Sequence, residues 1–206
     1  MPNNMTNNMT NKTVKSLSEL PEGDAHLKET QLSSEDLFEG AFLNLKRDKV
    51  SLPDGKSALR EYLTHPGAVA IFPVLDDGRI LLERQYRYPV GQAILEIPAG
   101  KLEKGEDPLL CAQRELTEET GYTASHWTFM GRIHPVISYS TEFIDIYLAK
   151  GLTAGERDLD EGEFLDVFAA TLEELSVWVK DGTITDVKTI ISSYWYREEL
   201  AKNIKK

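Results

Sequence analysis

Short apolar runs separated by turn residues occupy the middle of the chain. The run AVAIFPVL spans residues 68–75, RILLERQYR follows at 79–87, and QAILEIP lies at 92–98. Apolar runs of this length, bounded by glycine, proline or aspartate, are typical of β-strands. We therefore expect three successive strands in this region.

The N-terminal part of the chain follows a different pattern. Residues 1–34 are rich in Asn, Thr, Ser and Glu and carry few large apolar groups, so we expect a mobile or loosely docked segment. Within residues 35–65, two strand-like runs flank the turn Pro53-Asp54-Gly55, which predicts a β-hairpin. A hairpin is marginally stable alone, so we expect it to pack on another part of the protein or on a second subunit.

A helical period replaces the strand pattern between residues 107 and 120. Apolar side chains recur there at helical spacing, Pro108 suits the first turn, and Gly121 suits the C-terminal end. Strand-like runs resume at 126–134 and 143–150, and the acidic loop GERDLDEGEF follows. The segments LEELSVWVKDG and DVKTIISSYWYREEL then predict two terminal helices. Strands and helices without regular alternation favour an α+β fold.

The composition limits the partners of the chain. Among its 206 residues, 34 are acidic and 23 are basic, which gives a formal net charge of −11. Surplus acid repels nucleic acid and anionic membranes, and no apolar run reaches the roughly 18 residues of a membrane span. The single cysteine, Cys111, excludes an intramolecular disulfide and a thiolate zinc cluster. Because the first residues also lack the apolar stretch of a signal peptide, we expect a cytoplasmic protein that binds neither nucleic acid nor membranes.

Three glutamates lie on overlapping parts of one face of the predicted helix. Glu115 is three residues before Glu118 and four before Glu119, and like charges at this spacing cost roughly 0.2–0.5 kcal/mol per pair. Carboxylate oxygens suit hard cations such as Mg²⁺ or Mn²⁺, which would offset the repulsion and neutralise a phosphate-bearing substrate. A solvated acidic helix face is the alternative interpretation of the triplet alone.

The wider stretch GKLEKGEDPLLCAQRELTEETGY, residues 100–122, resembles the Nudix box. Every charged or glycine position of that signature is filled, by Gly100, Glu106, Arg114, Glu115, Glu118, Glu119 and Gly121. Tyr122 departs from the small aliphatic residue usual at the last position, which affects packing. The resemblance implies the Nudix fold, a mixed β-sheet sandwiched between α-helices. It places a small N-terminal β domain at residues 35–65 and a catalytic domain at residues 66–206.

The resemblance also implies a hydrolase in which one to three Mg²⁺ ions bridge a pyrophosphate while water attacks a phosphorus. Glu115 and Glu119 would be the main metal ligands, assisted by the Ala99 carbonyl and Glu118. Arg114 and Glu106 would orient the glutamates and the loop, a role that differs little from a structural salt bridge.

Outside the box, the layout resembles the ADP-ribose (ADP-sugar) pyrophosphatase branch of this family. The shared features are the hairpin, the sequence RQYR, a Ser-Tyr-Ser-Thr-Glu loop and the acidic loop. This branch implies ADP-ribose as substrate, with AMP and ribose 5-phosphate as products, and a homodimer that exchanges N-terminal segments. Arg60 and Arg87 match arginines that contact the diphosphate or lie near the base, and Glu142 matches a glutamate that binds ribose hydroxyls. Surface arginines and an exposed loop acid are the alternatives.

One departure from the branch widens the choice of substrate. Ile137 and Ser138 stand where many members have proline and glycine, which admits another nucleotide sugar. In the acidic loop, Glu161 aligns with the catalytic glutamate that activates water, and Glu163 aligns with an additional metal ligand. The loop also offers Glu156, Asp158 and Asp160 for these roles.

Two further functions compete with this prediction. The chain could hydrolyse GDP-mannose, a dinucleoside polyphosphate or NADH by the same chemistry. It could instead sense a nucleotide sugar without cutting it, as some Nudix domains do. Sensing modules commonly lose box glutamates or carry a DNA-binding domain, whereas this chain keeps all three glutamates and has no basic patch for DNA.

Overall fold

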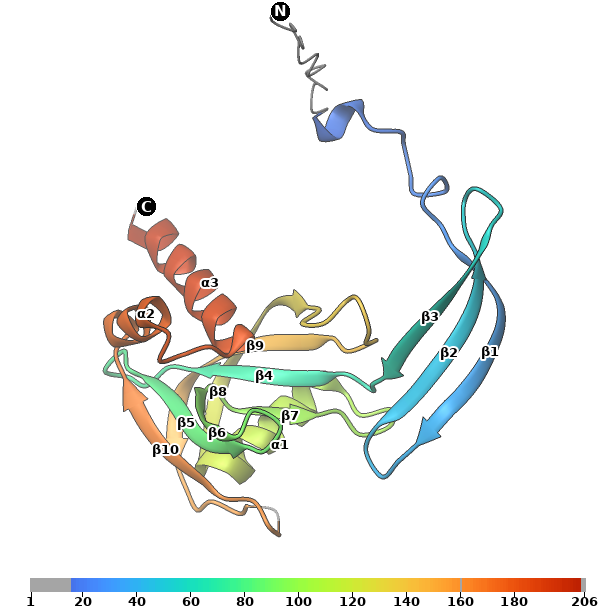
Figure 1. The fold of residues 1–206 in the computed structure, drawn as a ribbon. Helices are drawn as coiled ribbons and strands as arrows, with labels where there is room; N and C mark the ends of the chain where they lie inside the picture. The colour runs from blue at the N-terminus through green and yellow to red at the C-terminus, as the bar shows by residue number, and fades with distance from the viewer. Residues whose placement is uncertain (1–15, 160, 205–206) are drawn as a thin grey trace, which may run out of the picture. The chain divides into compact units, whose positions relative to one another are not determined.

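The computed structural model describes residues 16–159 and 161–204 (Figure 1). These residues separate into two compact units, one made of 16–35 and 47–60 and the other of 36–46 and 61–204. The mobility that we expect for residues 1–34 stays a prediction, and residues 1–15 lie outside the described part of the chain.

Three strands form the N-terminal sheet, after a 3-10 helix at Leu17–Glu19. Their order across the sheet is β1 (Thr30–Glu39), β2 (Asn44–Ser51) and β3 (Ser57–Thr64). The predicted hairpin is confirmed, and Gly55 takes a positive φ of 82° in its turn. Strand β1 differs from expectation, because the boundary drawn after residue 34 falls inside it. Its sequence TQLSSEDLFE is mostly polar and exposed at every position, so no buried face marks it as a strand.

Two further sheets form the larger unit. A mixed four-stranded sheet has the order β7 (Ala99–Lys101), β4 (Ala68–Pro73), β9 (Ile144–Ala154) and β8 (Tyr122–Ile133), and only the central β4–β9 pair is parallel. An antiparallel three-stranded sheet has the order β10 (Leu165–Ala170), β5 (Ile80–Arg87) and β6 (Gln92–Glu96). The five strands predicted after residue 66 are confirmed. The short β7 and the partly polar β10 were not expected.

All three predicted helices are confirmed, as α1 (Pro108–Thr120), α2 (Leu172–Asp181) and α3 (Val187–Ile204). Asp107 caps α1 by accepting hydrogen bonds from the next two free amides, and Pro108 fills the first helical position. Gly121 ends α1 with a φ of 75°, which other residues rarely adopt. These local signals fix where the box helix begins and ends.

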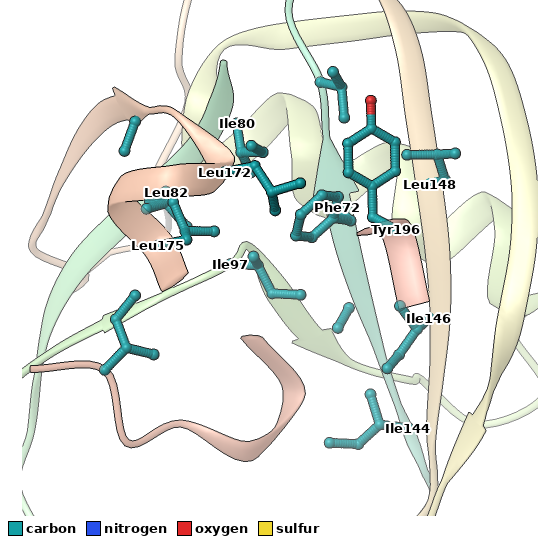
Figure 2. Packing of buried hydrophobic residues seen from close by; sticks show 14 of the residues in the cluster. Phe72, Ile80, Leu82, Ile97, Ile144, Ile146, Leu148, Leu172, Leu175 and Tyr196 are labelled. Atoms are coloured by element: carbon teal, nitrogen blue, oxygen red, sulfur yellow. The ribbon is translucent and has the colours of Figure 1, made fainter. Parts of the chain in front are cut away.

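Strand β4 is buried on both faces, and its alternating side chains enter two different cores. Val69 and Ile71 pack with Leu116 of α1. Ala70 and Phe72 belong to the opposite core, where Phe72 lies 5.2 Å from the ring of Tyr196 on α3 (Figure 2). Helices therefore cover both faces of the mixed sheet, which confirms the expected α+β class with a separate N-terminal sheet. None of the helices in the described residues combines the length and apolarity needed to cross a membrane.

Candidate active site

The box helix α1 is held directly against strand β7. The backbone amide of Ala99 donates a hydrogen bond of 3.1 Å to Glu119 Oε2. Gly100 faces Glu115 so closely that an added Cβ would lie 1.9 Å from the carboxyl carbon. Because Glu115 and Glu119 are one helical turn apart, both carboxylates project from one face of α1 toward β7.

Arg114 binds the carboxylates on the outer side of this arrangement. Its Nε lies 3.1 Å from Glu106, and its Nη1 lies 2.9 Å from Glu115 and 2.8 Å from Glu118. The hydrogen bond between Arg114 and Glu106 raises the pKa of the arginine and lowers that of the glutamate. These contacts agree with an orienting role for Arg114 and Glu106, which stays a prediction.

Glu119 lacks an arginine or lysine partner among the described residues, although it is only 4% exposed. Burial raises the pKa of its carboxyl to about 10, and the negative charges of Glu83, Glu115 and Glu163 add to the shift. Burial also raises the pKa of Glu115, against the opposing charge of Arg114. Glu119 therefore has no ion-pair partner among the described residues, and Glu115 has only Arg114.

Glu83 belongs to the same group of carboxylates and was missed by sequence reasoning. It lies on β5 and is 1% exposed. Burial, followed by the charges of Glu96 and Glu163, raises its pKa to about 8. The available signal was an acidic residue inside the apolar run RILLERQYR, because a buried charge in a strand requires a compensating partner.

The donor chemistry of this group fits a hard divalent cation. Among the described residues, no three His, Cys, Asp or Glu side chains are arranged to hold an ion by themselves. Mg²⁺ commonly uses only one or two carboxylates and completes its shell with water and substrate phosphates. The carboxylate oxygens of α1, which repel one another, and the backbone carbonyl oxygen of Ala99 on β7 are the type of ligand that such an ion prefers. The assignment of Ala99, Glu115, Glu118, Glu119 and Glu163 as its ligands stays a prediction.

The acidic loop contributes Glu163 to this group. Its Oε1 accepts a hydrogen bond of 3.1 Å from Gln85 on β5, and its charge acts on Glu83, Glu115 and Glu119. Glu161 is exposed and forms no hydrogen bond or ion pair with another described residue. Asp160 lies outside the described residues. The structure thus brings Glu163 to the carboxylates and leaves Glu161 at the surface of its loop.

A cleft opens beside the carboxylates. A cavity of about 200 Å³ is lined by Ala99 and Gly100 together with Arg87, Glu142 and Lys188. A second cavity, of about 430 Å³, shares the last three of these residues. Ala99 binds Glu119 and Gly100 faces Glu115, so two residues of the cleft wall also adjoin the box glutamates. Two predicted substrate-binding residues, Arg87 and Glu142, are therefore brought together.

Arg87 is fixed in the cleft by a salt bridge with Glu96. Its Nε and Nη2 donate to the two carboxyl oxygens at 2.7 and 2.9 Å. Lys188 of α3 binds the same carboxylate and lies 3.1 Å from Asp186. Burial opposes the charge of Glu96, but the bond from Arg87 and the charge of Lys188 together lower its pKa. Sequence reasoning missed Glu96 and Lys188, which are far apart in the sequence and meet only in the folded chain.

Glu142 is positioned by a loop that pairs with the end of β3. Thr141 and Tyr139 exchange backbone hydrogen bonds with Leu63, and the Ser140 hydroxyl accepts from the Glu142 amide at 3.1 Å. The carboxylate of Glu142 lies 4.0 Å from His65 Nε2. The side chain is thus held at the edge of the cleft.

Arg60 lies in the other compact unit. Its Nε donates a hydrogen bond of 2.9 Å to Glu29, and its Nη2 forms a second bond to the same carboxylate. Its predicted contact with substrate stays a prediction.

Comparisons with known proteins agree with this geometry. Residues 64–191 match the NUDIX domain, and residues 29–63 match the nucleoside diphosphate sugar hydrolase N-terminal domain. A methanol dehydrogenase activator from Bacillus methanolicus is 40% identical over 85% of this chain and 97% of its own length. An ADP-ribose pyrophosphatase from Bacillus subtilis is 42% identical over 79% of this chain and 89% of its own length. The crystal structure of an ADP compounds hydrolase superposes with a TM-score of 0.77 at 24% identity, over 85% of this chain and 96% of that one.

Proposed function

We propose, from the premise that the chain belongs to the NUDIX domain family, that it hydrolyses the pyrophosphate bond of a nucleoside diphosphate sugar. The proposed substrate is ADP-ribose, and the products are AMP and ribose 5-phosphate. One observation carries the proposal: buried carboxylates short of positive charge adjoin a cleft that holds Arg87. A diphosphate bound in that cleft would meet the Arg87 guanidinium, and the carboxylates next to Ala99 and Gly100 would hold the cation.

The proposed chemistry is attack of water on a phosphorus of the diphosphate. A bound Mg²⁺ or Mn²⁺ supplies positive charge against the pyrophosphate and acidifies the attacking water. Glu115 and Glu119 are its main ligands, and the further ligands are the Ala99 carbonyl, Glu118 and Glu163. Arg114 and Glu106 keep the box carboxylates in place through the salt bridges described above.

The base that takes the proton from water is proposed to be Glu161. A carboxylate on a loop can reach the water when the loop closes over substrate. Glu163 is the alternative base, because its carboxylate already lies among the other acidic groups.

Substrate recognition is assigned to Arg87, Arg60 and Glu142. Arg87 is 41% exposed and engages Glu96 through Nε and Nη2, so its Nη1 can donate to a phosphate oxygen. Arg60 is proposed to contact the diphosphate or base, and Glu142 accepts hydrogen bonds from ribose hydroxyls. The N-terminal match to nucleoside diphosphate sugar hydrolases and the relative described as an ADP-ribose pyrophosphatase both support this substrate class.

A hydrolysis screen tests the proposal. The purified chain is incubated with ADP-ribose, another ADP-sugar, GDP-mannose, a dinucleoside polyphosphate and NADH, with Mg²⁺ or with a chelator, and products are separated by chromatography. We expect AMP from ADP-ribose at the highest kcat/KM, and no turnover with chelator or in Glu119→Gln. Absence of turnover on every diphosphate would favour a sensing module, and a higher kcat/KM for another compound would reassign the substrate.

We also propose that the chain forms a homodimer through its N-terminal sheet. Strand β1 is exposed at all ten positions, which include Leu32, Leu37 and Phe38. Exposed apolar side chains gathered on one strand favour an interface. Light scattering after size exclusion would give twice the mass of the 23.2 kDa chain, and Phe38→Glu would reduce it to the monomer.

A second candidate function is activation of a methanol dehydrogenase. The relative described as a methanol dehydrogenase activator aligns over nearly its whole length. Addition of the chain to a methanol dehydrogenase, with Mg²⁺, would raise its turnover if this function is shared. Glu119→Gln then shows whether the effect requires the box carboxylates.

A further inference from the structure

Glu83 is a buried carboxylate with an unsatisfied oxygen. It is 1% exposed, and among the described residues no donor lies within hydrogen-bonding distance of its Oε1. Because buried polar atoms in native proteins nearly always have a partner, this oxygen indicates a partner outside the protein chain, such as a bound ion or water.

The strand directs Glu83 toward the site. On β5, the side chains of Glu83, Gln85 and Arg87 share one face, because alternate residues of a strand point the same way. Gln85 reaches Glu163 of the acidic loop, and Arg87 reaches Glu96 of β6. The third member of this face is therefore aimed at the same group of carboxylates.

The cations nearby are already engaged. Glu83 lies directly opposite Glu96 in the β5–β6 register. Glu96 receives both Arg87 and Lys188, and Lys188 is shared with Asp186. Glu83 itself forms no ion pair with a described residue. Its negative charge raises the pKa of Glu119, and this effect is larger than the effect of the charge on Glu115 or on Glu163.

We propose that Glu83 is an additional ligand for a divalent cation, at a position it shares with Glu119. This inference rests on the proposed function, and it adds a strand residue to the ligands that the box supplies. Glu83 comes from β5 and Glu119 from α1, so the position joins a strand and the box helix. Water and substrate oxygens complete the shell, as Mg²⁺ and Mn²⁺ commonly require.

Mn²⁺ titration of the full chain, followed by electron paramagnetic resonance of the free ion, tests the proposal without substrate. We expect Glu83→Gln to lose one bound Mn²⁺ per chain or to bind it at least 10-fold more weakly. The rise in Tm caused by Mg²⁺ is expected to shrink in the same variant. Unchanged stoichiometry and affinity would overturn the inference.

Asp145→Asn is the matched control. Asp145 is 3% exposed and loses the same charge, but its carboxylate is paired with Arg132 at 2.7 and 2.8 Å. We expect its Mn²⁺ binding to equal that of the unchanged chain. Equal weakening in both variants would mean that losing any buried carboxylate disturbs binding, which would overturn a specific role for Glu83.

Glu119→Gln separates this inference from the proposed function. If it weakens Mn²⁺ binding and Glu83→Gln does not, the proposed function stands and Glu83 is not a ligand. If the unchanged chain binds no Mn²⁺, both fail. Circular dichroism checks folding, and Glu83→Asp replaces Glu83→Gln if the latter does not fold. The shorter side chain keeps the charge and should weaken binding several-fold, whereas unchanged binding would overturn the inference.

Discussion

The side chain of Glu115 lies so close to Gly100 that residue 100 has no room for a side chain of its own. A Cβ added at Gly100 would lie 1.9 Å from both the Cδ and the Oε1 of Glu115. Gly100→Ala must therefore displace this carboxylate or separate α1 from β7. We expect a loss of about 1–3 kcal/mol in the free energy of unfolding and a larger relative loss of Mg²⁺-dependent turnover.

Chemical denaturation and initial-rate kinetics measure these two effects. Gly155→Ala is the control, because the nearest atom to its added Cβ is 3.2 Å away and its φ is not positive. Turnover in Gly100→Ala equal to that of Gly155→Ala would show that the close approach does not position Glu115.

The buried carboxylates also predict a pH dependence of stability. The folded pKa values of Glu83 and Glu119 are about 8 and about 10, above the ordinary value of 4.5. Above pH 4.5 the folded chain keeps protons that the unfolded chain releases, so the metal-free protein loses stability as the pH rises. Each group contributes up to about 1.4 kcal/mol per pH unit in this window.

Thermal melts between pH 5 and pH 8 measure this slope, with chelator and with Mg²⁺. We expect Tm to fall with rising pH in chelator and to recover with Mg²⁺, because the ion favours ionised carboxylates. Glu119→Gln should reduce the slope. A Tm in chelator that rises across the window would contradict the raised pKa values.

Arg87 is expected to contribute to substrate binding through the planar shape of its guanidinium, and not only through its charge. Arg87→Lys keeps the charge but loses the two parallel bonds to Glu96. Loss of one charge-assisted hydrogen bond to substrate costs about 1.5–3 kcal/mol, or about 10- to 150-fold in affinity. We expect this loss mainly in KM for ADP-ribose.

Arg84→Lys is the matched control, because Arg84 lies on the opposite face of β5 and pairs with exposed Asp166. Its KM should stay within about twofold of the unchanged chain, as is usual for exposed ion pairs. Equal changes in the two variants would remove Arg87 from the substrate site.

The two loop glutamates make different predictions for the base. If Glu161 accepts the proton, Glu161→Gln should lower kcat about 10²- to 10⁴-fold while Mn²⁺ affinity stays unchanged. Glu163→Gln should weaken Mn²⁺ binding, because its carboxylate lies with the other acidic groups. An unaffected kcat in Glu161→Gln would transfer the base role to Glu163.

The elements that could be predicted from the sequence are those whose ends are marked by capping or turn residues next to them in the chain. The cap at Asp107, Pro108 and Gly121 define the box helix within a few residues of the chain. The turn at Gly55 likewise defines the hairpin. By contrast, β1 is mostly polar and exposed at every position, so no apolar pattern marks it, and β10 depends on pairing with the distant strand β5.

The same distinction applies to the site. The box carboxylates lie within one helical turn, so their spacing alone places them together. Glu83 and Glu96 become neighbours only through the β5–β6 register, and Lys188 reaches Glu96 from 92 residues away. The contact of Lys188 with Glu96 leaves no signal in a single sequence, whereas Glu83 was marked only by its position in an apolar run.

The bond between Lys188 and Glu96 connects the last helix to the carboxylate that holds Arg87. Lys188→Met would remove the ammonium group that shares Glu96 with Arg87. The guanidinium would then be drawn more strongly to its own carboxylate and away from an incoming nucleotide. This substitution is thus expected to weaken ligand capture while the glutamates of the box remain chemically intact.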